Sequence, residues 1–464
     1  MKRLDQALAI GPMYLAEFER AGIRTVRDLA TVESLPEVSG RTGIPLDLVQ
    51  QWHEQAKAKI RASRYRRRVA IGIVAVALAI LGWLLVAYLR SPDRISAQAD
   101  AALDSGENAR ALALYDKVIR LAPQNRFAYA NRAEALRRLS RTDEALASIN
   151  KALDFDPSDV WVYNERGNIY FDLEQYDRAI QDYEKAVQLD PNYKFAYGGK
   201  GLALEALKRY EEALVPLNKA IELDPEYAWG YNERGDVYTD LQQYEPALKD
   251  YDKTIALSPK YRVAYGSRGF ALSRLGRYED AVEAFTKELA LDPDNAWAYA
   301  ERGGIRHDHL DQFEPAYQDL KKAFEQSPTH LGYGADLAEA ALTSGRFDEA
   351  NDLAGKILAE TADKDEKEFS VSSRLSMRFV VIAALLLKGR TAEVKTKLDE
   401  FVAYARSVGP KYDRTWNYGG TLHYMQGRAM DRTSKDLILG LLKFLDRPPH
   451  LTIDRIQELG SALR

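Results

Sequence analysis

The chain has 464 residues, a formal net charge of −4 at neutral pH and no cysteine. The missing thiols exclude disulfides, thiolate metal sites and cysteine nucleophiles. The charge is unevenly spread, because residues 57–68 hold seven Lys or Arg and no acid whereas residues 91–464 carry a net charge of −10. An acidic region of this size disfavours nucleic acid as its ligand and favours basic or neutral partners.

Residues 1–56 are predicted to form a small domain of short helices separated by the breaks Gly11-Pro12, Ala21-Gly22-Ile23 and Thr42-Gly43-Ile44. The segment resembles a helix-hairpin-helix domain. Many members of that family bind the DNA backbone through hairpin amides. Here a proline follows the single hairpin glycine and removes one amide donor, which favours a structural or protein-binding head. A head that binds DNA stays open as an alternative.

Val69–Leu89 is an uncharged apolar run of about the 20 residues that a membrane-spanning helix needs. The basic segment 57–68 precedes it, so the positive-inside rule predicts a single-pass protein with residues 1–68 in the cytoplasm. Arg64, Arg66, Arg67 and Arg68 are then topology determinants that also attract anionic membrane lipid. The most natural setting is a bacterial inner membrane with the remainder in the periplasm. A cleaved signal peptide ending near Ala97-Gln98-Ala99 is the alternative, and the long leader argues against it.

Six prolines recur every 34 residues along the middle of the chain: Pro123, Pro157, Pro191, Pro225, Pro259 and Pro293. The unit that ends at Pro191 carries Gly167 and Ala179, and the same triplet recurs at equal offsets in the next three units. The unit resembles a tetratricopeptide repeat (TPR). In that family the glycine and the alanine let two helices pack closely, and the proline ends the second helix.

This resemblance implies an all-α fold in which helical hairpins stack into a right-handed TPR-type solenoid with a groove lined by first helices. We expect about eight repeats over residues 91–362, with an inserted residue at the turn Arg306–Asp311. Residues 363–464 are expected to form degenerate hairpins, one of them beginning at Trp416, and a cap at Ile453–Leu463 after the break Pro448-Pro449.

A finer period of 68 residues runs through the array, since Trp161 and Trp229 begin the same Trp-x-Tyr-Asn-Glu-Arg-Gly motif and Trp297 begins a close variant. Duplication alone can explain this alternation. The resemblance nevertheless implies groove-facing positions on the first helices, where amides and aromatic rings suit an extended peptide. The candidates for a protein-binding groove are Phe127, Trp161, Asn164, Asn168, Phe171, Phe195, Trp229, Asn232, Asp236 and Trp297. In the competing interpretation the tryptophans pack between hairpins and only the asparagines face outward.

A second series of basic residues occupies one equivalent site in successive repeats: Arg132, Arg166, Lys200, Arg234, Arg268 and Arg302. We expect these side chains to be structural, with their charged ends on nearby acids.

No catalytic motif is present, so we expect neither an enzyme nor a cofactor. His307-Asp308-His309 is the one metal-like cluster, but residues two apart point away from each other on a helix. The sequence therefore predicts a membrane-anchored, extracytoplasmic scaffold or assembly factor with protein partners. A DNA-binding tether and a platform for glycan polymers are the alternatives.

Overall fold

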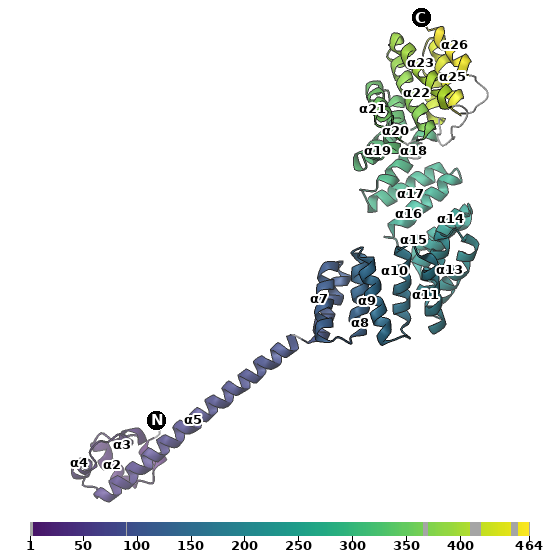
Figure 1. Cartoon of the computed structure of the whole chain (residues 1–464). Helices are drawn as coiled ribbons and strands as arrows, with labels where there is room; N and C mark the ends of the chain where they lie inside the picture. The colour runs from purple at the N-terminus through teal and green to yellow at the C-terminus, as the bar shows by residue number, and fades with distance from the viewer. Residues whose placement is uncertain (1–2, 90, 365–369, 409–418, 447–452, 464) are drawn as a thin grey trace. The chain divides into compact units, whose positions relative to one another are not determined.

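The computed structural model describes residues 3–89, 91–364, 370–408, 419–446 and 453–463 (Figure 1). These residues form helices and no strand, and they divide into two compact units, Met1–Leu139 and Ser140–Arg464. The all-α prediction is confirmed within this described part of the chain.

The N-terminal head has its own apolar core, in which Leu4, Phe18, Leu29 and Val49 are fully buried. Trp52 closes this core, with its ring centroid 5.8 Å from that of Phe18. The five helices that contribute are α1 (Leu4–Ala7), α2 (Pro12–Arg20), α3 (Val26–Ala30), α4 (Leu35–Thr42) and the first turns of α5 (Leu46–Leu89). The likeness to a helix-hairpin-helix domain stays a prediction.

Helix α5 continues without a break from the head through the basic segment and the apolar run. The predicted transmembrane helix Val69–Leu89 is wrong, because none of the helices described here is both long enough and apolar enough to cross a bilayer.

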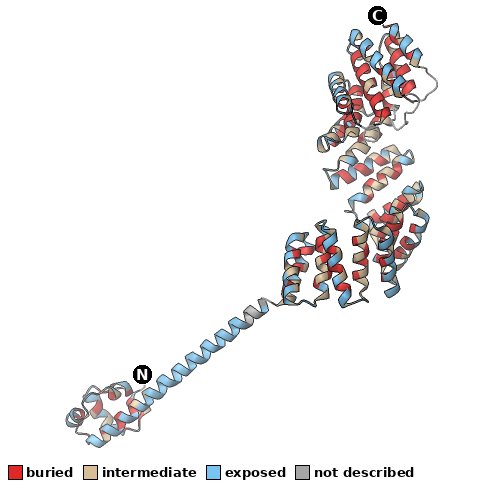
Figure 2. Ribbon diagram, in the orientation of Figure 1, coloured by how far each residue is buried: buried red, intermediate tan, exposed pale blue. Residues whose placement is uncertain are grey.

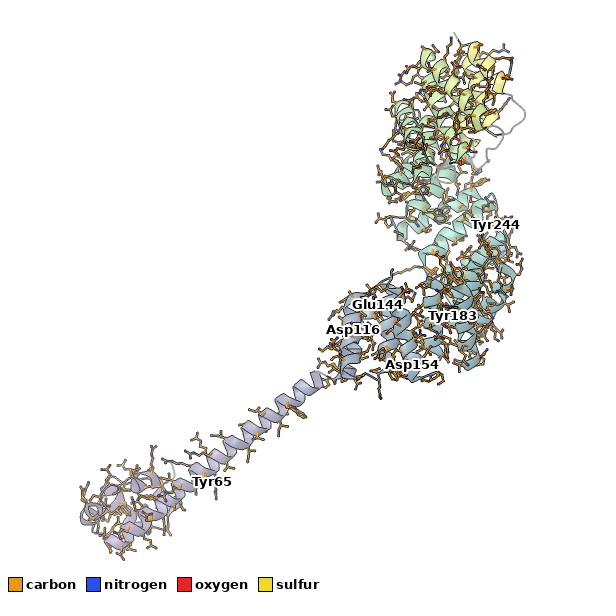
Figure 3. All side chains as sticks on the ribbon, in the orientation of Figure 1. Tyr65, Asp116, Glu144, Asp154, Tyr183 and Tyr244 are labelled. Carbon is orange, nitrogen blue, oxygen red and sulfur yellow. The ribbon has the colours of Figure 1, made fainter. Side chains whose placement is uncertain are left out.

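Three further predictions depended on that transmembrane helix and lose their basis: the single-pass inner-membrane location, the periplasmic array and the lipid contact through this helix. The arginines Arg64, Arg66, Arg67 and Arg68 lose their predicted topological role and lie exposed on α5. Tyr65, labelled in Figure 3, is 71% exposed on the same stretch.

Pairs of helices follow within the described residues, and inside each unit a first helix contacts the second helix that comes after it. The first hairpin is α6 (Pro92–Asp104) and α7 (Asn108–Leu121), and α8 (Arg126–Arg138) and α9 (Thr142–Phe155) follow. The later first helices are α10 (Val160–Asp172), α12 (Lys194–Ala206), α14 (Ala228–Asp240), α16 (Arg262–Arg274), α18 (Ala296–Asp308) and α20 (Leu331–Thr343). Their second helices are α11 (Tyr176–Leu189), α13 (Tyr210–Leu223), α15 (Tyr244–Leu257), α17 (Tyr278–Leu291), α19 (Phe313–Gln326) and α21 (Phe347–Glu360). The expected insertion is confirmed, because His309–Gln312 joins α18 to α19 with one residue more than Leu275–Arg277 between α16 and α17.

The repeat glycines allow the two helices of a hairpin to touch. A Cβ atom on Gly235 of α14 would lie 2.6 Å from Cε1 of Tyr251 on α15, and the same holds for Gly167 and Tyr183. Real side chains do not approach this closely, so the glycine makes room for the buried ring. Figure 2 shows the resulting line of buried residues along the hairpins.

The recurrent basic residues on the first helices are structural, as expected. Arg234 donates two hydrogen bonds to Asp250, at 2.7 and 2.6 Å, from a side chain that is 19% exposed. Arg166 and Arg302 pair in the same way with Asp182 and Asp319 of the second helix that follows. The alternate repeats instead reach the preceding second helix, in the pairs Arg132–Asp116, Lys200–Glu184 and Arg268–Asp252. Each clamps a first helix to a second helix with a charge-assisted contact.

The C-terminal helices form one core with the last repeat hairpins. They are α22 (Val371–Leu387), α23 (Thr391–Val408), α24 (Gly419–Gly427), α25 (Arg432–Asp446) and α26 (Ile453–Ser461). Helix α26, the expected cap, buries Ile456 and contacts α23 and α25. Trp416 and Pro448-Pro449 lie outside the described residues.

Gly235→Ala should destabilise the array by about 1–3 kcal/mol, because the added methyl group meets the ring of Tyr251. The matched control is Gly304→Ala on α18, where a Cβ meets nothing within 4 Å and should gain about 0.5–1 kcal/mol. Urea unfolding of the full chain, followed by circular dichroism, measures both changes. Equal effects of the two substitutions would contradict the packing argument.

Arg234→Met should cost about 3 kcal/mol, because it leaves the buried carboxylate of Asp250 without its partner. Arg277→Met removes a solvent-exposed pair with Asp280 and should change stability by less than about 1 kcal/mol. The same unfolding experiment compares them, and a negligible loss for Arg234→Met would show that the clamp is dispensable.

Candidate functional site: the first-helix face

The first helices of successive repeats in the second unit contact one another, from α10 with α12 to α18 with α20. Each presents residues spaced by three, four and three positions, such as Trp161, Asn164, Asn168 and Phe171 on α10, and this spacing places them on one side of a helix. We call the surface formed by these positions on α10 to α18 the first-helix face.

The opening position of this face is apolar in every repeat and exposed in several. Phe195 on α12, Val263 on α16 and Trp297 on α18 are 47%, 42% and 38% exposed. Phe127 takes the same position on α8, in the first unit, and is 57% exposed. Large apolar side chains that recur at one exposed site form a row, which is typical of an interaction surface rather than of scattered surface residues.

On α10 and α14 the opening position is held by Trp161 and Trp229, which are both half-buried. The ring of Trp229 fills the space above Gly198 on α12, where a Cβ atom would overlap it. Trp297 is similarly packed, edge to face against Phe285. The tryptophans therefore pack between neighbouring hairpins and leave only part of each ring for a ligand.

Aromatic rings run without interruption from α12 to α14. The ring centroids lie 5.4 Å apart for Tyr193 and Phe195, 5.6 Å for Phe195 and Tyr227, and 5.7 Å for Tyr227 and Trp229. The ammonium group of Lys194 lies 5.0 Å from the ring of Phe195 and pairs with Asp224. This side of the face offers a rigid aromatic platform.

The asparagines of the motif are not exposed groups. Asn164 and Asn232 are 5% and 1% exposed, and the Oδ1 atom of each has no hydrogen-bond partner. Asn168 is half-buried, with its Nδ2 donating to Glu165 at 3.0 Å and its Oδ1 accepting from the hydroxyl of Tyr183 at 2.8 Å.

Asp236 on α14 is the equivalent of Asn168 on α10. Its carboxylate accepts hydrogen bonds from the Tyr251 hydroxyl at 2.7 Å and from Asn232 Nδ2 at 2.8 Å. Burial raises the pKa of Asp236 to about 6, although the hydrogen bonds from Tyr251 and Ser267 oppose the rise.

Further acids surround Asp236. Glu205 on α12 and Glu233 on α14 both have the pKa raised to about 8, first by burial and then by neighbouring carboxylates. Asp240 completes the group and accepts a hydrogen bond from Tyr210. We call Glu205, Glu233, Asp236 and Asp240 the acidic cluster.

A cavity of about 560 Å³ lies farther along, between α16, α18, α20 and α22. Glu301, Asp336 and Glu339 line it, and Thr421 of α24 donates a hydrogen bond to Glu339.

The histidines of the metal-like cluster make other contacts. His307 forms hydrogen bonds with Asp308 and Thr343, and the ring of His309 stacks on that of Tyr278. In the described part of the chain no group of three His, Asp or Glu could hold a metal ion.

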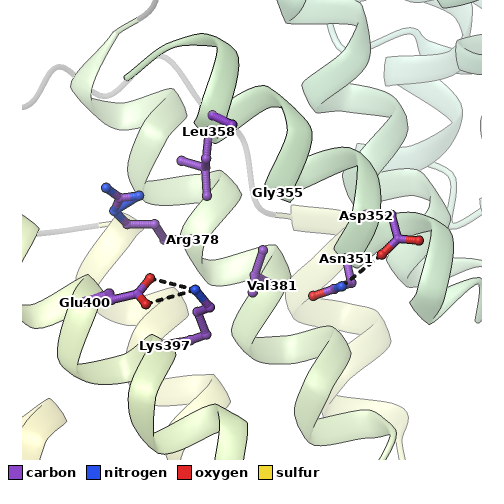
Figure 4. A pocket seen from close by; sticks show the side chains of 9 residues that line it. Asn351, Asp352, Gly355, Leu358, Arg378, Val381, Lys397 and Glu400 are labelled. Atoms are coloured by element: carbon purple, nitrogen blue, oxygen red, sulfur yellow. Dashed lines mark hydrogen bonds and ion pairs between the residues drawn. The ribbon is translucent and has the colours of Figure 1, made fainter. Parts of the chain in front are cut away.

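A second hollow, of about 530 Å³, lies between α21, α22 and α23 (Figure 4). Arg378 projects into it, and Lys397 is paired with Glu400 at 2.9 Å. This hollow does not involve the first-helix face.

The predicted groove residues on α10, α12, α14 and α18 fall at equivalent positions of the repeats, but Asn164 and Asn232 among them are buried and do not line a surface. The sequence analysis missed Glu205, Glu233, Asp240 and Tyr251. A usable signal existed, because Tyr115, Tyr183 and Tyr251 recur every 68 residues and face Asp100, Asn168 and Asp236.

Five models of the same type of repeat match parts of the chain. Models described as tetratricopeptide repeat match residues 96–160, 160–193, 230–261 and 263–295, and a model described as TPR repeat matches residues 201–239. A search among curated proteins finds no significant match.

Solved structures similar to the chain include MamA, with 30% identity over 35% of this chain and 96% of that chain and a TM-score of 0.32. YrrB, titled a TPR protein with an unusual peptide-binding site, shows 25% identity over 40% of this chain and 95% of its own, with a TM-score of 0.31. A TPR protein from Parabacteroides merdae shows 21% identity over 53% and 97%, with a TM-score of 0.42. Because the matched models fall on the hairpins described above, the chain belongs to the tetratricopeptide repeat family.

Proposed function

We propose that the first-helix face binds an extended segment of another protein and that the chain acts as a scaffold or assembly factor. The observation that carries this proposal is the exposed apolar row of Phe195, Val263 and Trp297, which repeats at one position of the array. A row with regular spacing suits a ligand that is itself extended and repetitive, as a polypeptide backbone is.

The polar groups beside the row favour the same ligand. Asn168 and Asp236 are held in place by tyrosine hydroxyls, so a partner meets oriented amide and carboxylate groups rather than mobile ones. Oriented polar groups next to rigid rings give affinity at a low entropic cost. A glycan polymer also stacks on rings, and competition by envelope polysaccharides distinguishes that ligand from a protein.

The double variant Phe195→Ser/Val263→Ser should lose the proteins that the wild-type chain captures from its own cells, because it interrupts the apolar row at two repeats. Affinity capture of the full chain followed by mass spectrometry provides the readout.

Val215→Ser is the matched control, since Val215 is 69% exposed but lies on the second helix α13. Partners that persist in the double variant, or that are lost equally in the control, would refute the first-helix face as the binding surface.

A further inference from the structure

The acidic cluster lacks the basic partners that the first-helix arginines provide to acids on the second helices. Asp182, Asp250 and Asp319 are each paired with an arginine of the preceding first helix. Within the described residues, none of Glu205, Glu233, Asp236 and Asp240 forms an ion pair.

The hydrogen bonds inside the cluster hold the carboxylates without neutralising them. Tyr251 and Asn232 donate to Asp236, and Tyr210 donates to Asp240. Ser267 also donates to Asp236, and all these donors are uncharged, so no cation of the chain neutralises these carboxylates when they ionise.

A second and independent observation is a shortage of hydrogen-bond donors. Asn232 is 1% exposed, and its amide nitrogen lies between Glu233 and Asp236 while its Oδ1 atom has no partner. The Oε2 atom of Glu205 is likewise buried without a partner. Glu233, 8% exposed, receives one long hydrogen bond of 3.4 Å. Buried acceptors in native proteins are normally satisfied, so this group is suited to a ligand that brings donors.

A ligand that satisfies these acceptors is rich in hydrogen-bond donors, and a positively charged one also pairs with the carboxylates. A lysine ammonium has three donors and an arginine guanidinium five, and neither has an acceptor. A metal ion does not fit, because no three ligating side chains converge within the described residues. The aromatic rings of Phe195, Tyr227 and Trp229 lie on the same two helices, and they offer a surface for the apolar stem of a long cationic side chain.

We propose that the acidic cluster on α12 and α14 receives a lysine or arginine side chain of the partner segment. The proposal rests on the proposed function, because that segment is the one bound along the first-helix face. It adds that the segment is basic and that its charged residue enters between Glu205 and Glu233.

Selection of random peptides displayed on phage against the full chain tests the proposal directly. The selected peptides should be enriched in Lys or Arg at one position relative to their apolar residues. With the variant Glu205→Gln/Glu233→Gln this enrichment should disappear, and a peptide selected on the wild type should bind at least tenfold more weakly.

The control variant Glu184→Gln/Asp252→Asn removes the same charge from second helices, where both acids already have basic partners, and should keep the enrichment. Peptides that bind through the apolar row without Lys or Arg enrichment would overturn this inference and leave the proposed function standing. If no peptide binds, or if Phe195→Ser/Val263→Ser leaves binding unchanged, the proposed function itself fails.

The raised pKa values also predict how the free chain responds to pH. Glu205 and Glu233 have a folded-state pKa of about 8 against an ordinary value of 4.5, so the folded state holds their protons more tightly than the unfolded state. The stabilising contribution is present below about pH 4.5 and is lost as the pH rises through about 8. Tyr210, Tyr251 and Tyr261 also face these carboxylates and stay neutral over this range.

The urea midpoint of the wild-type chain should therefore fall more between pH 6 and pH 9 than the midpoint of Glu205→Gln/Glu233→Gln. Over the same range a lysine-containing peptide should bind several-fold more tightly as the pH rises, because the carboxylates ionise while lysine stays charged. Parallel midpoint curves for the two proteins, or weaker peptide binding at high pH, would contradict the assignment.

Discussion

The close approach of helices at the repeat glycines is the constraint on which the rest of the array depends. The missing side chain of Gly235 lets the ring of Tyr251 enter the hairpin, and the hydroxyl of that ring then reaches Asp236, the next residue of α14. In the preceding repeat Leu217 fills the equivalent place beside Gly201 and offers no hydroxyl. The alternation of the binding surface thus originates in the core, and a change of core residue changes the polar groups that a partner meets.

The packing of first helices on second helices also determines which acidic side chains have a basic partner. The arginine row of the first helices pairs with acids on the second helices, as Arg166 does with Asp182 and Arg234 with Asp250. These pairs stabilise the hairpin and neutralise the second-helix acids that they reach. Within the described residues Glu205, Glu233, Asp236 and Asp240 form no such pair, and they lie on α12 and α14, which also carry Phe195 and Trp229 of the aromatic platform.

Much of the fold could be predicted from the sequence, because a period of 34 residues with Gly167, Ala179 and Pro191 at fixed offsets specifies both helices and their turn. The extra residue before Phe313 was also predictable from the shift in register. The acidic cluster was not, since Glu205 and Glu233 lie 28 residues apart and look like ordinary helix surface until stacking brings α12 beside α14. The contact of α24 with α18 and α20 depends on tertiary packing, which no local pattern encodes.

For the apolar run after Arg68, the sequence predicted a feature that the structure contradicts. Composition alone suggested a bilayer span, whereas the structure describes one helix that continues from the head core through the basic segment. A hydropathy profile measures how apolar a segment is, but it does not show where the helix that contains the segment begins.

Hydrogen exchange of the full chain, measured by mass spectrometry with and without a bound lysine-containing peptide, tests the central claim most directly. We expect slower exchange in α12 and α14, where the aromatic platform and the acidic cluster lie, and little change in α13 and α15. Protection confined to the second helices, or to the hollow between α21 and α23, would contradict it.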